Sequence, residues 1–305
     1  MPEVIEVLNY ADFLRSKLKN RTITEINIIN GRYKKHGDFE NLDQLQASLP
    51  QAVAKIQTKG KFLYIQFENG MYLFSTLGLS GGWLYMNNKS KGAQVQFGYH
   101  LDYITEEQQD SYHKSAFNHR NVEFKLDDNT SIYYYDTLSF GTLKVITDEA
   151  HLNKKLSTLG PDISQQSTTL PVFKAQLEKA VHQNKPIGTV LMNQRVVSGI
   201  GNYLRADVLW LSKISPFRKV KDISPTEIKQ LWTNSRLLTW SKYNYNKGLA
   251  SGFIDKDHPK IPEDYGREFY VYSMASDPQG HPVKKEELYD GSQKRFIYWS
   301  PKVQA

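Results

Sequence analysis

The sequence contains no cysteine. This absence excludes disulfide bonds, thiolate nucleophiles and every zinc or iron–sulfur site that depends on cysteine ligands. No apolar run approaches the roughly 20 residues that a membrane-spanning helix requires. The first residues show no basic stretch followed by an apolar core, so we expect no secretory signal and an intracellular protein. The sequence does not distinguish the nucleus, the cytoplasm and a viral replication site.

Positive charge is unevenly distributed along the chain, which has 305 residues and a net charge of +7. That length predicts two domains of about 150 residues each. Residues 1–150 carry 16 Lys and Arg against 18 Asp and Glu, whereas residues 151–250 carry 15 against 5. A patterned basic segment is typical of proteins that bind nucleic acid, although lysines that merely solvate the surface would give the same count.

The first half of the chain reads mainly as β-strands. Apolar residues at helical spacing between Val7 and Leu18 predict one leading helix. Short β-branched and aromatic runs follow, separated by turn signals such as Asn69-Gly70 and 127–130. Several short strands with regular turns predict a β-sandwich.

The second half changes to a helical period. Ser224, Pro225 and Glu227 form the pattern of a capped helix start. Strands are expected again at 268–272 and 295–299, with a turn between them at 277–280. The fold class is therefore α+β. The predicted helices span 170–183, 187–196, 202–214 and about 224–247.

The amino terminus could carry chemistry. The initiator Met is expected to be removed before Pro2, which leaves a secondary amine able to form an iminium with an aldehyde-like carbon. Glu3 and Glu6 lie next to it and one helical turn on, where they could transfer protons. The alternative is an ordinary helix start, at which acidic residues are stabilising without any catalytic role.

Three further features could hold phosphates. Gly199 and Gly201 join two predicted helices, and Asn202 is expected to cap the second helix and to donate its amide to a phosphate oxygen. Lys61 precedes a strand, and Arg295 lies on the final hairpin among aromatic residues. The alternatives are a capped helical hairpin, a solvated strand entry and a charged hairpin tip that opposes aggregation.

Taken together, these residues resemble the Fpg/Nei family of base-excision DNA glycosylases (formamidopyrimidine-DNA glycosylase and endonuclease VIII). The resemblance runs from the first residues to about Gln304, and the segment from Asn202 to Trp210 is closer to the endonuclease VIII branch. The matching motifs are Met1-Pro-Glu3 with Glu6, Lys59-Gly-Lys61, Leu77-Gly-Leu-Ser-Gly81, Tyr135-Asp-Thr-Leu-Ser-Phe-Gly141, Leu159-Gly-Pro-Asp162 and Gln194 to Asn202.

The chain departs from the family pattern at its end. Most members close with a four-cysteine zinc finger, whereas Ser300 and Val303 stand at two of the expected cysteine positions here. The spacing of Arg295 and Gln304 nevertheless matches the family. The chain therefore is similar to the zincless-finger members, which include viral and eukaryotic endonuclease VIII-like proteins, and no metal or cofactor is expected.

The resemblance implies a role for each site residue. Pro2 would attack C1′ of a flipped-out nucleotide, and Glu3 would handle protons at the sugar. Glu6 and Asp207 would support these residues or orient the substrate, and the alternative is that both are ordinary helix carboxylates. Lys61, Asn202 and Arg295 would hold phosphates around the lesion. A separate residue, Leu79, would fill the gap in the duplex, with help from Phe117 or Arg120.

The implied domains are a helix and β-sandwich catalytic domain at 1–147, a linker at 148–168, a helix–two-turn–helix domain at 169–266 and a zincless-finger hairpin at 267–305. The implied function is a glycosylase with AP lyase activity (β,δ-elimination) that removes oxidised pyrimidines, with ring-opened purines as a second candidate substrate class. The expected partner is double-stranded DNA with damaged bases or abasic sites. The protein is expected to bind it as a monomer, and no membrane partner is expected. The alternatives are a catalytically inactive damaged-DNA-binding protein of the same fold and, less favoured, a single-strand or RNA binder that stacks bases on its 19 tyrosines.

Overall fold

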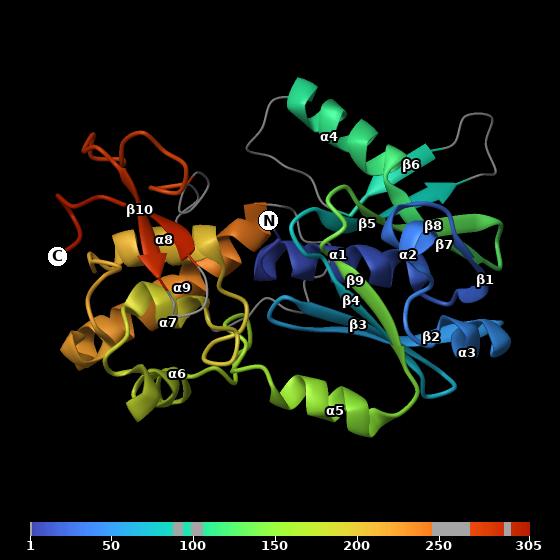
Figure 1. Cartoon of the computed structure of the whole chain (residues 1–305), viewed down its shortest axis with the longest axis horizontal. Coiled ribbons are helices and arrows are strands. Elements are labelled where there is room, and N and C mark those ends of the chain that lie inside the picture. Colours follow the sequence, from blue (N-terminus) through green and yellow to red (C-terminus); the bar gives the residue numbers. More distant parts are fainter. Residues whose placement is uncertain (1, 88–93, 99–105, 246–268, 290–293) are drawn as a thin grey trace. The chain divides into compact units, whose positions relative to one another are not determined.

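The structure is a computed structural model that describes residues 2–87, 94–98, 106–245, 269–289 and 294–305 (Figure 1). The chain divides into two compact units. Among the described residues, one unit comprises Pro2 and residues 6–157, and the other comprises residues 3–5, 158–245 and 269–305 without 290–293. No described helix is long and apolar enough to cross a membrane.

The first unit is built on antiparallel strands, as the alternating sequence pattern predicts. The described strands follow the order β6-β5-β8-β7-β1-β2-β3-β4-β9. Strands β1 and β2 pair only where Thr22 faces Ala52 and Ile23 faces Gln51, so the sheet divides there into the two layers of a sandwich. The strands are β1 (Thr22–Ile28), β2 (Gln51–Lys59), β3 (Phe62–Phe67), β4 (Tyr72–Thr76), β5 (Gly81–Asn87), β6 (Gln94–Phe97), β7 (Arg120–Leu126), β8 (Thr130–Asp136) and β9 (Thr142–Ile146).

Helix α1 (Val4–Leu18) packs its apolar face into the core of this unit. Leu14 and Leu18 are buried there together with Trp83, whose ring lies 5.3 Å from that of Tyr134 in an edge-on contact. Burying such side chains stabilises the fold by about 1.5–3 kcal/mol each. The remaining helices of the unit are α2 (Gly31–His36), α3 (Leu42–Ala47), α4 (Glu106–Asn118) and α5 (Glu149–Ser157).

The second unit is helical and ends in a β-hairpin. The predicted capping box is confirmed, because Glu227 N–H donates to Ser224 Oγ and Ser224 N–H donates to Glu227 Oε2. Its elements are α6 (Leu170–Leu177), the 3₁₀ turn η1 (Ala180–His182), α7 (Ile187–Met192), α8 (Asn202–Leu211), the 3₁₀ turn η2 (Val220–Asp222), α9 (Pro225–Tyr245), β10 (Lys284–Tyr289) and β11 (Lys294–Trp299).

Three expectations need correction or comment. Residues 269–272 of the predicted strand 268–272 are not a strand, because Val271 and Tyr272 donate their N–H groups to the Asp207 carboxylate instead of to a neighbouring strand. The hairpin partner of β11 is β10, which the sequence analysis missed. The stretch 148–168, expected as a linker, contains α5, and the division between the units falls after Ser157. Residue 268 and the predicted end of the last long helix near Lys247 lie outside the described residues.

Candidate active site and nucleic-acid interface

The Glu3 carboxylate caps helix α8 from a distant part of the sequence. Oε2 accepts the N–H groups of Gly201 at 2.7 Å and Leu204 at 3.3 Å, and Oε1 accepts the N–H of Tyr203 at 2.9 Å. These are the free donors at the start of a helix, and they favour a negative charge. Glu3 is 1% exposed. The structure therefore gives Glu3 a docking role, and its role in proton transfer stays a prediction.

The backbone next to Glu3 is held by the same turn. Val4 N–H donates to the carbonyl of Gly199 at 3.2 Å. Gly199 has a φ of +109°, and a Cβ at this position would lie 3.0 Å from Cβ of Val4. Glycine is therefore required both by the backbone angle and by the close approach of the amino-terminal segment. Since Pro2 immediately precedes Glu3, this docking limits where the Pro2 nitrogen can lie.

Asn202 does not cap α8 as expected. Gly201 is the N-cap residue, and Asn202 is the first helical residue. Its Oδ1 accepts a hydrogen bond from Nη2 of Arg205. Because a guanidinium only donates hydrogen bonds, the Asn202 oxygen must face Arg205, and the amide nitrogen is the donor of the Asn202 side-chain hydrogen bond to Tyr272. An amide nitrogen carries two hydrogens, so Asn202 can donate to a phosphate oxygen as well as to Tyr272.

Arg205 is a site residue that the sequence analysis quoted but did not assign. Its Nη1 donates to the carbonyl of Gly188 at 3.1 Å, and Nη2 also donates to the carbonyl of Phe296 at 2.9 Å. Burial lowers the pKa of Arg205 to about 10, Glu3 acts in the opposite direction, and Arg295 lowers it further. Arg205 therefore ties α7, α8 and β11 together and places Glu3, Asn202 and Arg295 in one electrostatic neighbourhood.

Asp207, on α8, is buried and accepts the N–H groups of Val271 at 3.0 Å and Tyr272 at 3.1 Å. Burial raises the pKa of this carboxyl, while Lys242 and the backbone donors lower it. Burial also raises the pKa of Tyr272, and Glu3 raises it further. The contacts give Asp207 a positioning role for the segment that carries Tyr272.

The other predicted residues belong to the first unit. Lys61 is half-buried and follows Gly60 in the turn between β2 and β3, where Gly60 has a φ of +57°. Glu6 is buried on α1, and Pro2 is half-buried. The structure thus brings Glu3, Asn202 and Arg295 together in one unit, whereas Pro2, Glu6, Lys61 and Leu79 belong to the other.

Leu79 lies in an apolar loop pair that the sequence analysis recognised only in part. Leu79, Leu138 and Phe140 are 40%, 56% and 61% exposed, which is unusual for large apolar side chains. Their two loops touch, because a Cβ on Gly78 would lie 2.9 Å from that of Phe140. The motif from Tyr135 to Gly141 was the available signal for Leu138 and Phe140.

The buried Asp136 carboxylate holds these two loops in place. It accepts the Ser80 hydroxyl at 2.5 Å and the Gly141 N–H at 2.6 Å. Phe117 and Arg120, named as possible helpers of Leu79, contact each other. The Arg120 guanidinium lies 3.8 Å from the ring centre of Phe117 and donates to the Phe117 carbonyl.

The described residues of the carboxy-terminal segment offer no set of donors for a structural zinc ion. Val303 offers no ligand atom at one expected cysteine position, and the described residues contain no group of three His, Asp or Glu that could hold a metal. Asp277 organises the turn before β10 by accepting the N–H groups of Gln279 and His281, both at 2.9 Å. Trp210 on α8 donates its indole N–H to the same carboxylate at 3.3 Å.

Comparison with known proteins agrees with this geometry. Models of the formamidopyrimidine-DNA glycosylase N-terminal domain and H2TH domain match residues 1–143 and 159–239. The chain is 26% identical to formamidopyrimidine-DNA glycosylase of Mycoplasma genitalium (85% of this chain, 81% of that protein) and 24% identical to Endonuclease 8 of Salmonella arizonae (100% of both). Its fold resembles the Lactococcus lactis formamidopyrimidine-DNA glycosylase bound to DNA with an AP site, with a TM-score of 0.73, 20% identity and 99% coverage of each chain. The chain therefore belongs to the Fpg/Nei family of DNA glycosylases.

Proposed function

We propose that this protein is a base-excision-repair DNA glycosylase with AP lyase activity that uses Pro2 as its nucleophile and removes oxidised pyrimidines, with ring-opened purines as a second substrate class. One observation carries the proposal. The Glu3 carboxylate is fixed by three backbone donors of the helix–two-turn–helix, so the secondary amine one residue away is attached to a rigid anchor. A nucleophile needs such positioning to reach a sugar carbon in a productive geometry.

The chemistry follows from an amine at Pro2. Its nitrogen attacks C1′ of the flipped-out nucleotide, the bond from C1′ to the base breaks, and the base leaves with a proton. Opening of the sugar ring gives an iminium between the Pro2 nitrogen and C1′. Loss of a C2′ proton then expels the 3′ phosphate, a second elimination expels the 5′ phosphate, and water releases the sugar fragment from the amine.

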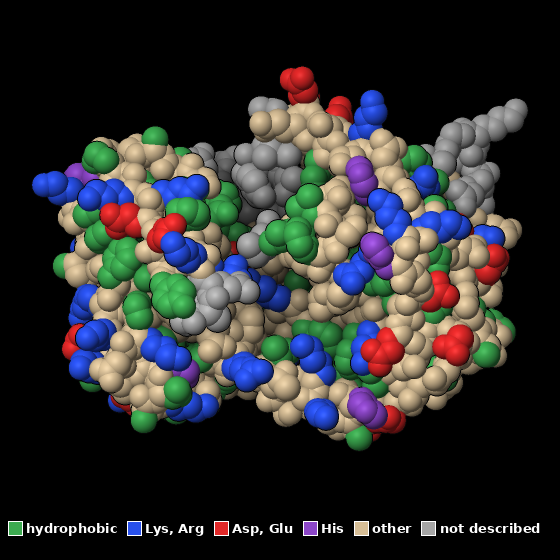
Figure 2. Space-filling view, in the orientation of Figure 1, with side chains coloured by type: hydrophobic (Ala, Val, Ile, Leu, Met, Phe, Trp, Pro, Cys, Tyr) green, Lys and Arg blue, Asp and Glu red, His purple; other side chains and the backbone are tan. Residues whose placement is uncertain are grey.

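The DNA contacts are assigned to both units. Asn202 and Arg295 bind backbone phosphates, as does Lys61, and such contacts position the duplex without reading its sequence. Figure 2 shows Lys and Arg side chains spread over the surface of the helical unit. The gap that the flipped nucleotide leaves is filled by the apolar side chains of Leu79, Leu138 and Phe140. These side chains are exposed to water in the free protein, which is unfavourable, and stacked bases would cover them.

Borohydride trapping tests the proposal. The protein is incubated with a labelled duplex that contains an oxidised pyrimidine, and the iminium is reduced to a stable crosslink. We expect a crosslinked band with the native chain and none with a form that carries one extra residue before Pro2. The extended form retains every lysine, so a crosslink that survives the extension would assign the reaction to a lysine amine and contradict the role of Pro2.

The competing function is damaged-DNA binding without catalysis. It predicts tight binding to a duplex with an abasic site, together with no trapped band and no strand cleavage. A duplex in which uracil has been removed beforehand already contains an abasic site. Cleavage of this duplex requires only the lyase step, so it separates the two functions. Cleavage of this duplex but not of lesion-containing DNA would limit the proposal to the lyase activity.

A further inference from the structure

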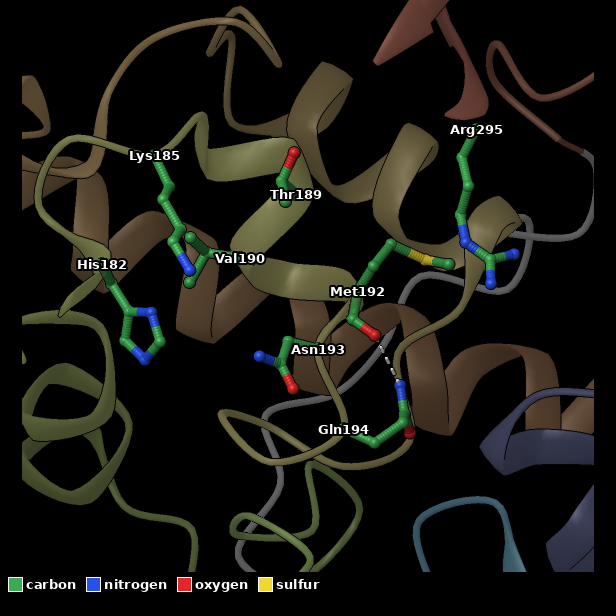
Figure 3. A pocket seen from close by; sticks show the side chains of 8 residues that line it. All are labelled: His182, Lys185, Thr189, Val190, Met192, Asn193, Gln194 and Arg295. Atoms are coloured by element: carbon green, nitrogen blue, oxygen red, sulfur yellow. Dashed lines mark hydrogen bonds between the residues drawn. The ribbon is translucent and has the colours of Figure 1, made fainter. Parts of the chain in front are cut away.

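The helical unit contains a hollow that the proposed contacts of Asn202 and Arg295 do not explain. We call it the α7 hollow. Its volume is about 320 Å³, and Figure 3 shows that its side chains come from η1, the segment between η1 and α7, α7 itself, the turn after α7 and β11. The polar residues that line it are His182, Lys185, Thr189, Asn193, Gln194 and Arg295.

The charge of the α7 hollow is positive. Lys185 and Arg295 enter it from opposite sides (Figure 3), and no carboxylate is among its lining residues. Within the part of the chain that the structure describes, Lys185 makes no ion pair with a carboxylate. Burial lowers the pKa of His182, and the nearby Lys185 and Lys179 lower it further, which reflects the surplus of cations around it. The charged side chains that line the hollow are therefore all basic.

The turn after α7 is held by hydrogen bonds and leaves the side-chain nitrogen of Asn193 available as a donor. Gln194 donates to the carbonyls of Met192 and Ile200 and accepts the N–H of Gly199 at 2.9 Å, so its amide is fully used. Asn193 Oδ1 accepts the N–H of Arg195 at 3.0 Å. That bond fixes the amide of Asn193 with its nitrogen available to donate.

We propose that the α7 hollow binds a further phosphate of the DNA backbone, held by Lys185 and by the Asn193 amide, beyond the phosphates assigned to Asn202 and Arg295. This inference rests on the proposed DNA-binding function and extends its contact surface across α7. Cationic side chains together with amide and hydroxyl donors suit the oxygens of a phosphodiester group. Lys185 and Asn193 are both exposed, so a continuous strand could reach them.

The salt dependence of DNA binding tests this assignment. A protein that loses one phosphate contact releases fewer counterions, so the plot of log binding constant against log salt becomes shallower by about 0.9. We expect this change for Lys185→Gln, with a dissociation constant about three- to tenfold higher at low salt. Lys229→Gln is the control, because Lys229 is an exposed lysine on α9 outside the hollow. An unchanged slope for Lys185→Gln, or the same change for Lys229→Gln, would overturn the inference.

A second variant removes the donor without removing a lysine. Asn193→Asp keeps the oxygen that accepts from Arg195 but replaces the amide nitrogen by a charged oxygen. We expect DNA binding to weaken by at least as much as with Lys185→Gln, with the melting temperature unchanged. Normal DNA affinity for this variant would contradict the assignment.

Undamaged duplex DNA and inorganic phosphate separate the possible outcomes. A backbone contact is independent of the lesion, so the slope on undamaged duplex must change as well, even if the trapping experiment fails and the proposed catalysis is wrong. Inorganic phosphate is titrated by NMR into the wild-type protein and the Lys185→Gln variant. Phosphate binding that depends on Lys185, together with an unchanged DNA slope, would identify a site for free anions and overturn a DNA contact.

Discussion

Replacing Asp277 by Asn should destabilise the carboxy-terminal hairpin, because this carboxylate organises a finger that lacks cysteine. The Asp277 side chain is fully buried. Burial alone would raise its pKa, but hydrogen bonds, led by that from the His281 backbone, lower it to about 2. In Asp277→Asn the side-chain oxygen still accepts backbone N–H groups, whereas the new NH₂ group faces the indole N–H of Trp210. The new NH₂ group and the Trp210 indole N–H would then face each other as two buried donors without an acceptor.

The magnitude follows from the pKa. A pKa of about 2 in the folded protein, against the ordinary 3.8, corresponds to about 2.5 kcal/mol in favour of folding at neutral pH. Because the folded-state pKa is depressed, this contribution is complete above about pH 4 and is lost as the pH falls towards 2. Asp277→Asn removes the contribution at every pH, and the unpaired donors add a cost of about 1–3 kcal/mol.

The assay is denaturant unfolding of the wild type and of Asp277→Asn between pH 7 and pH 2, with hydrogen exchange of β10 and β11 as a local probe. We expect a gap of about 2.5 kcal/mol or more at pH 7 that narrows below pH 4. Asp148→Asn is the control, since Asp148 caps the exposed start of α5 by accepting the N–H of His151. Its cost should stay well below that of Asp277→Asn, because its bonds are exposed to water. A gap for Asp277→Asn that is below about 0.5 kcal/mol, or that stays constant with pH, would refute the reasoning.

Four other variants test the site. Gly199→Ala strains a left-handed backbone position and should lower the trapping rate at least tenfold, measured beside the melting temperature to detect loss of folding. Arg205→Lys loses the forked contacts to Asn202 and the hairpin, and should raise the dissociation constant for abasic DNA about tenfold or more in a binding titration. Phe140→Ser and Leu79→Ser should slow base removal from duplex DNA while leaving cleavage of a single-stranded abasic substrate unchanged in a gel assay. Equal loss on both substrates would argue against a wedge.

Local sequence signals predicted the regular elements well. The leading helix follows from apolar residues at helical spacing, and α9 begins at Pro225 because Ser224 and Glu227 satisfy each other's backbone donors. These features depend on neighbours within one or two turns. Strand β10 was missed because its residues, Lys-Lys-Glu-Glu-Leu-Tyr, are mostly charged. A two-stranded hairpin buries little of either face, so no hydrophobic alternation marks it.

Long-range contacts explain what the sequence could not predict. Asn202 was expected to cap α8, but the cap comes from Glu3, about 200 residues away in the sequence. Arg205 connects Gly188 with Phe296, and neither contact follows from spacing along one helix. Residues 269–272 have the composition of a strand, yet their donors are taken by Asp207. In each case a distant polar group outcompeted the local preference.

The same physical device recurs at these positions. A buried carboxylate accepts main-chain N–H groups of a helix start, loop or turn that have no partner in a regular hydrogen-bond pattern. Because carboxylate acceptors make strong hydrogen bonds to N–H groups, they can fix a loop without a metal ion. They also make the loop sensitive to a single protonation. The five carboxylates are Glu3 at the amino-terminal dock, Asp136 at the apolar loops, Asp162 after the division between the units, Asp207 beneath Tyr272 and Asp277 in the finger.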